Sequence, residues 1–172
     1  MLRTATFAGA CISPHTDEPS TVAPPAPDEL AYSLTLPASL TSPAIARAAA
    51  RSMLRAHGLD EAADTALQAV GELTACACRF SAGAEIYVSL RHGGDTIRVT
   101  VYDGHPRHTN ARLAAACDGR RRSALRLLAC VVRACGGEWG FGESREPGGG
   151  TRMWAHLPLP SACTGHQPPQ GQ

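Results

Sequence analysis

The sequence lacks the features that define several protein classes. No apolar run approaches the ~20 residues of a membrane-spanning helix, and the N-terminus has no apolar segment suited to a signal peptide. Charged residues make up only 18% of the chain and the net charge is +1, so no broad field would attract nucleic acid. We therefore expect a cytoplasmic protein without direct nucleic-acid binding and without membrane contact.

The cysteines lack the pattern of a disulfide or zinc framework. Their number is seven, which is odd, no C-x-x-C occurs, and the seven histidines are scattered. Disulfide scaffolds and zinc fingers need paired residues at short, fixed spacings, so neither is expected. We expect Cys76, Cys78, Cys130 and Cys135 to be buried as small hydrophobic residues.

Composition divides the chain into one domain with two tails. Residues 1–28 are rich in Pro, Ser, Thr and Ala, and residues 160–172 have a similar composition. Both segments have little to bury and are predicted to be disordered. Residues 29–159 are long enough to fold as a single domain.

Hydrophobic periodicity predicts an α+β fold. Strands are expected near 30–36, 85–91, 97–102, 138–144 and 151–159. Helices are expected at 42–57, with Ser42 as N-cap and Pro43 first, from Asp60 as cap to about 79, and at 123–135. Residues 104–119 are predicted to be a mobile loop with about one helical turn. This order favours a two-layer sandwich, with helices on one face of a mixed, mostly antiparallel sheet.

The one basic cluster is Arg120-Arg121-Arg122. We interpret it as the solvated start of the third helix. A contact with phosphate or with a partner is the less favoured alternative.

Three places carry residues suited to chemistry. Glu72 and Cys76 lie four apart on one helix face, where a carboxylate could deprotonate a hydroxyl, although an exposed helix Glu has the same pattern. Asp103-Gly104 ends a strand, where Asp could accept a hydrogen bond from a ligand amine, although Asp-Gly is also a common turn. Gly148-Gly149-Gly150-Thr151 suits a tight hairpin connection.

The order and spacing of these places, over Leu34 to Leu159, resemble the GHKL (histidine-kinase-like) ATPase superfamily. The chain is most similar to its stand-alone anti-sigma-factor serine kinases. The resemblance implies ATP as ligand, Glu72 as the catalytic residue, and Cys76 at the position of the Mg²⁺-ligating Asn. It also implies that Asp103, with Gly104, reads the adenine amine, and that Thr151, in the family's last turn and strand, belongs to the adenine end of the site.

The resemblance places the family's glycine-rich phosphate segment, at a helix start, on Arg122, Ser123, Ala124 and Leu125, where only the Leu is kept. A Cys sulfur is a poor replacement for an oxygen ligand of Mg²⁺, and the lost glycines restrict the backbone. We therefore expect weakened Mg²⁺·ATP binding with adenine recognition by Asp103 retained. The arginine cluster could instead grip phosphate through its side chains.

Two functions follow from the resemblance. The first is a serine kinase that phosphorylates a STAS-type antagonist and binds a sigma factor. The alternative is a catalytically inactive partner-binding module with weak or no Mg²⁺·ATP binding. A detached histidine-kinase ATP domain ranks third, because no phosphoacceptor helix pair is present. Small relatives commonly dimerise, so a homodimer is a further expectation.

Overall fold

The computed structural model describes residues 23–106, 108–145 and 149–160. Its strands form one five-stranded sheet in the order β1-β2-β3-β5-β4. All four pairings are antiparallel, which confirms the predicted α+β class; the described strands form no parallel pair. The strands are β1 (Ala31–Pro37), β2 (Glu85–His92), β3 (Thr96–Asp103), β4 (Glu138–Glu143) and β5 (Thr151–Pro158).

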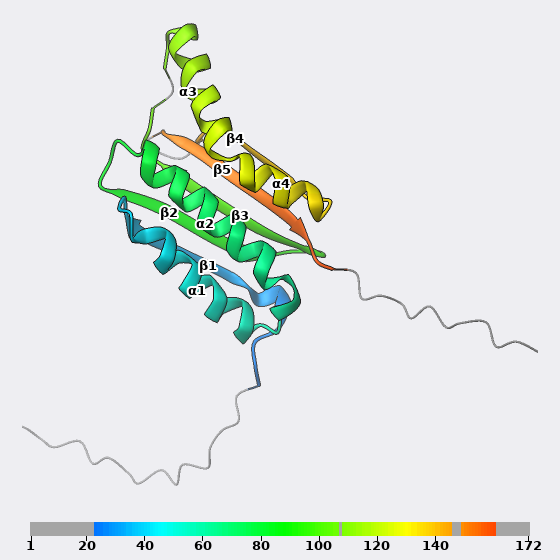
Figure 1. Cartoon of the computed structure of the whole chain (residues 1–172). Helices are drawn as coiled ribbons and strands as arrows, with labels where there is room; N and C mark the ends of the chain where they lie inside the picture. Colours follow the sequence, from blue (N-terminus) through cyan, green and yellow to red (C-terminus); the bar gives the residue numbers. More distant parts are fainter. Residues whose placement is uncertain (1–22, 107, 146–148, 161–172) are drawn as a thin grey trace, which may run out of the picture.

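Helices cover one face of this sheet. Figure 1 shows α1 (Ser42–Ala56), α2 (Ala63–Phe80) and α4 (Arg126–Ala134) lying side by side over the strands. Alternate strand residues point toward them, because side chains alternate between the two faces of a strand. The apolar stripe predicted for the second helix forms the centre of the core with these strand residues. The fully buried residues of this core include Val70, Leu73, Ala77, Ile97, Val99 and Val101.

The N-cap positions of two helices differ from the prediction, by one residue for α1 and two for α2. Helix α1 already begins at Ser42, so Thr41 occupies the N-cap position, without a side-chain capping hydrogen bond. The Ser42 hydroxyl instead donates to the carbonyl of Pro37 at 2.6 Å. Asp60 begins a short 3-10 turn before α2, and its carboxylate lies 3.9 Å from Arg55 without capping the helix.

The largest error in the prediction concerns residues 104–119. They include most of α3 (Ala111–Ala124), a helix of 14 residues, where a mobile loop was expected. The Asn110 side chain caps it by accepting from the backbone N–H groups of Arg112 and Leu113 at 3.0 and 3.2 Å. An Asn cap followed by alanines favours a helix, so this local pattern argues for a helix here and against a loop.

The predicted helix at 123–135 is likewise wrong at its start. The chain bends at Leu125, so Ser123 and Ala124 end α3, and a separate helix, α4, follows. Figure 1 shows α3 extending past the end of the sheet where β5 begins, while α4 packs over the strands. The only fully buried residue of α3 is Arg121.

Of the two predicted tails, residues 1–22 and 161–172 lie outside the described residues. Within the described part, Pro27–Glu29 form a 3-10 turn, and the Ala26 carbonyl accepts a hydrogen bond from His57 Nδ1 at 2.6 Å. The contacts of the folded domain therefore begin a few residues before the predicted boundary at residue 29. None of the helices in the described ranges combines the length and apolar character needed to cross a membrane.

Candidate functional site

The candidate site is centred on a buried ion pair between Asp103 and Arg121. Asp103 ends β3 on the face beneath the helices and is 4% exposed, while Arg121, near the end of α3, is 1% exposed. The Arg121 Nη1 donates to Asp103 Oδ2 at 2.7 Å. Burying either charge alone would be costly, so each depends on the other.

The rest of the guanidinium is enclosed by soft and aromatic groups. Its central carbon lies 4.4 Å from the centre of the Phe80 ring. Nη1 also approaches the Met153 sulfur at 3.1 Å and the Cys76 sulfur at 4.0 Å. Nη2 has no hydrogen-bond partner among the described residues. The interpretation of this cluster as a solvated helix start is therefore wrong. All three arginines lie in the C-terminal half of α3, and only Arg120 and Arg122 are exposed.

The second carboxylate oxygen of Asp103 is also engaged. Oδ1 accepts from the backbone N–H of His105 at 3.0 Å. The buried hydroxyl of Thr151 donates to the His105 carbonyl at 3.2 Å. At Gly150, φ is +95°, and a Cβ there would collide with the carbonyl oxygen of Asp103. Thr151 and Gly150 thus hold the segment after β3 in place.

Little space remains next to the ion pair. The pocket that contains Arg121 and Thr151 has a volume of about 10 Å³, room for about one water molecule. Small-molecule sites usually enclose ~300–1,000 Å³. Its other lining residues are His105, Pro106, His108, Ala114, Cys117 and Asp118. Arg121 thus fills most of the space beside Asp103.

Glu72 and Cys76 lie on α2 as predicted, but in different surroundings. Cys76 is buried, and burial raises the pKa of its thiol to about 11 despite the opposing effect of Arg121. It is therefore a neutral thiol at neutral pH. Glu72 is half-exposed and accepts a hydrogen bond from Gln68 at 3.3 Å.

The other predicted buried cysteines follow the expectation only in part. Cys78 and Cys135 are half-buried, and burial raises the pKa of Cys78. Cys130 is exposed, so its predicted burial is wrong: it lies on the solvent side of α4, whose buried stripe is Leu128 and Val132.

The segment expected to cradle phosphate does not lie at a free helix start. Arg122, Ser123 and Ala124 form the last turn of α3, and the Leu125 N–H donates to the Arg121 carbonyl at 3.0 Å. The backbone donor of Leu125 is thus already used inside the helix, unlike the free donors of a helix N-terminus. The exposed Arg122 stacks over Phe141 at 5.4 Å.

The remaining predicted residues have simple surroundings. Gly104 is exposed, and a Cβ at this position would make only ordinary contacts with Gly83. Gly148, of the predicted hairpin connection, lies outside the described residues.

The chain matches no protein-family model and no curated protein sequence. The resemblance to the GHKL superfamily therefore remains an expectation from its motifs.

Sequence reasoning missed two features of the site. The first is Arg121, and the second is the approach of His105 and His108 to Cys117. Cys117 and Arg121 are four residues apart, which on a helix puts them on the same face. The prediction of a loop at residues 104–119 provides no helix face, so it does not place Cys117 and Arg121 side by side.

A second region differs sharply from this site. The open sheet face, made up of Tyr87, Arg91, Arg98, Tyr102 and Arg152, surrounds a hollow of about 790 Å³. No helix in the described ranges packs on it (Figure 1). His156 lies in the same hollow, and its pKa is lowered by burial and by Arg98 and Arg152, against the weaker opposing effect of Glu138. The side chains of Arg91, Arg98 and Arg152 make this face positively charged.

Proposed function

We propose that this chain is a non-catalytic regulatory protein that binds its partners without using Mg²⁺·ATP. The observation that carries this proposal is the buried pair between Arg121 and Asp103, whose atoms lie 2.7 Å apart. The family resemblance assigns Asp103 to the adenine amine, yet both of its oxygens already accept hydrogen bonds. A nucleotide would have to displace a buried, paired guanidinium.

The phosphate end supports the same proposal. Mg²⁺ prefers oxygen ligands, and Cys76 offers a neutral sulfur at the position of the metal ligand. Phosphoryl transfer depends on positioning and on charge neutralisation by the metal. The backbone N–H of Leu125 is occupied within the helix. Each of these features weakens a different part of Mg²⁺·ATP binding.

The serine kinase remains the second candidate, and Glu72 is the observation that favours it. Its carboxylate is half-exposed, one helical turn before Cys76, where it could reach a partner's hydroxyl. This activity would require Arg121 to leave Asp103. Under both candidates the implied partners are a STAS-type antagonist and a sigma factor.

Calorimetric titration of the full chain with ATP and Mg²⁺ tests the proposal. We expect no saturable binding up to about 1 mM ATP, which means a binding free energy less favourable than about −4 kcal/mol. Arg121→Ala should gain affinity for ATP because it empties the space beside Asp103, and the exposed neighbour variant Arg122→Ala should not. Saturable, Mg²⁺-dependent binding to the unmodified chain would contradict the proposal.

A transfer assay separates the two candidates directly. The chain is incubated with radiolabelled ATP and a STAS-domain protein from the same genome. We expect a complex on size-exclusion chromatography that is unchanged by ATP, and no label on the partner. Label that disappears in Glu72→Ala would establish the kinase instead.

A further inference from the structure

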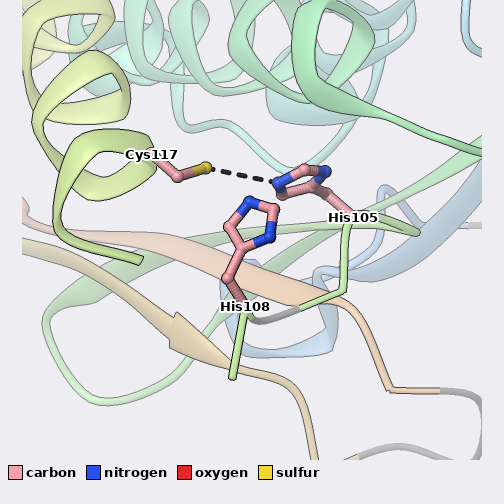
Figure 2. Close-up of side chains that lie close together, drawn as sticks. All are labelled: His105, His108 and Cys117. Carbon is pink, nitrogen blue, oxygen red and sulfur yellow. Dashed lines mark hydrogen bonds between the residues drawn. The ribbon is translucent and has the colours of Figure 1, made fainter. Parts of the chain in front are cut away.

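Three side chains that can bind a metal converge between β3 and α3. His105 and His108 come from the segment that follows β3, and Cys117 comes from α3 (Figure 2). One ligand atom from each lies within 4.8 Å of the other two. The Cys117 sulfur is 3.2 Å from His105 Nε2, and the two imidazole rings have centres 5.1 Å apart.

These distances suit a small tetrahedral ion. Bonds of ~2.3 Å to sulfur and ~2.0–2.1 Å to nitrogen put neighbouring ligand atoms roughly 3.3–3.6 Å apart. The 3.2 Å contact between Cys117 and His105 is slightly shorter than this spacing. The His108 ligand atom lies within 4.8 Å of both and would have to move closer to share the ion. A thiolate with two imidazoles favours Zn²⁺ over Mg²⁺ or Ca²⁺, which need oxygen ligands.

We propose that His105, His108 and Cys117 form a binding site for one Zn²⁺ ion, with the fourth position open to water. Three protein ligands with an open fourth position are a common arrangement for Zn²⁺. Binding requires the thiolate form of Cys117, so its proton is released to solvent when the ion binds. His105 and His108 are three positions apart and Cys117 follows nine positions later. This spacing lacks the second short-spaced pair of a zinc finger, so by itself it does not predict the site.

The ion would connect α3 to the segment that follows β3. Helix α3 is mostly exposed, and Arg121 is its one fully buried residue. Cys117 lies one turn before Arg121, on the same helix face. His105 is already tied to Asp103 and Thr151 through its backbone. A bound ion would therefore hold α3 against this segment and keep Arg121 beside Asp103.

Metal titration of the full-length, chelator-treated chain under reducing conditions tests the site. Co²⁺ serves as a spectroscopic probe for Zn²⁺. We expect one equivalent of Co²⁺ to give the visible bands of tetrahedral coordination and a near-ultraviolet sulfur-to-metal band, and Zn²⁺ to displace it. Loss of a second-shell partner already costs ~10–100-fold in metal affinity, so loss of one of the three protein ligands should weaken binding by at least ~100-fold.

Matched variants locate the ion. Cys117→Ser should abolish the sulfur-to-metal band, and His108→Ala should weaken binding by at least ~100-fold. Cys130→Ser removes an exposed cysteine of α4 and should change neither. No tetrahedral cobalt spectrum, or an unchanged spectrum in Cys117→Ser, would overturn the proposal. Neither measurement involves nucleotide, so the result is independent of the proposed function.

Hydrogen exchange tests the connection to Arg121. With Zn²⁺ bound, backbone amides of α3 should exchange more slowly than in the metal-free chain, and those of α1 should be unchanged. The same comparison in Cys117→Ser should show no effect of Zn²⁺ on α3. If the ion binds but α3 exchange stays the same, the inferred hold on Arg121 is wrong.

Discussion

The arginines of the candidate site and those of the open sheet face have opposite surroundings. Arg121 is 1% exposed and paired with Asp103, whereas Arg98 is exposed and lines an open hollow with Arg91 and Arg152. A buried charge is tied to a single geometry by the cost of losing its partner, while an exposed charge is solvated and can meet a partner molecule. Arginine therefore fills the space beside Asp103 in the candidate site, whereas on the open sheet face its side chains stay available to bind a partner.

This comparison also bears on how the chain would act. An ATPase with the predicted site would keep its polar groups free around an open pocket. Here both carboxylate oxygens of Asp103 already accept hydrogen bonds, and the large hollow lies on the opposite side of the sheet. On the proposed function, the positive open sheet face is the natural surface for an acidic region of a partner protein.

The largest expected effect is on stability. Arg121→Met removes the partner of Asp103 and leaves a buried carboxylate unpaired, which should cost about 3–5 kcal/mol of unfolding free energy. The matched change Arg98→Met on the open sheet face should alter it by less than ~0.5 kcal/mol. Urea denaturation of both variants measures the difference.

A double variant checks the cause of that loss. Replacing both partners, as in Arg121→Met with Asp103→Leu, should recover most of the lost stability, because no buried charge is left unpaired. If Arg121→Met alone were as stable as the unmodified chain, the pair could not be buried as described.

An intermediate effect is expected on thiol reactivity. Burial raises the pKa of Cys76 to about 11, so its thiolate fraction at neutral pH should be on the order of 100-fold below that of an ordinary cysteine. Exposed Cys130 should react with iodoacetamide far faster. Peptide mass spectrometry over a time course measures both rates, and equally fast labelling of the two would show that the site is open.

The smallest effect concerns His156 on the open sheet face. Its pKa should lie below the usual 6.5, because burial and the charges of Arg98 and Arg152 disfavour the imidazolium. Arg98→Gln should raise it, and proton NMR titration of both proteins measures the change. A His156 pKa above 6.5 in the unmodified chain would argue against the positive face.

The sign of the pH effect on stability follows from the same pKa. The unfolded chain takes up a proton on this histidine near pH 6.5, and the native protein does so only at lower pH. Protonation therefore favours the unfolded state, and this residue's contribution to stability falls as the pH drops below 6.5.

Most of the fold could be predicted from local patterns. Alternation marked the strands, and the stripe of Val70, Leu73 and Ala77 marked the face of α2 that packs on the sheet. The failure at α3 has a physical cause. Most of its residues are exposed and its one fully buried residue is an arginine, so it lacks an apolar stripe. Only the Asn110 cap and its alanines indicate a helix.

The sequence by itself determined the α+β class, the pairing of hairpins, and the strand end that carries Asp103, because each depends on periodicity and turn chemistry over short distances. Only the tertiary structure decided what Asp103 meets. Arg121 is 18 residues away along the chain, and nothing in a run of three arginines distinguishes the one that turns inward. Burial and pairing depend on packing between distant segments, and the same packing brings His105 and His108 to Cys117.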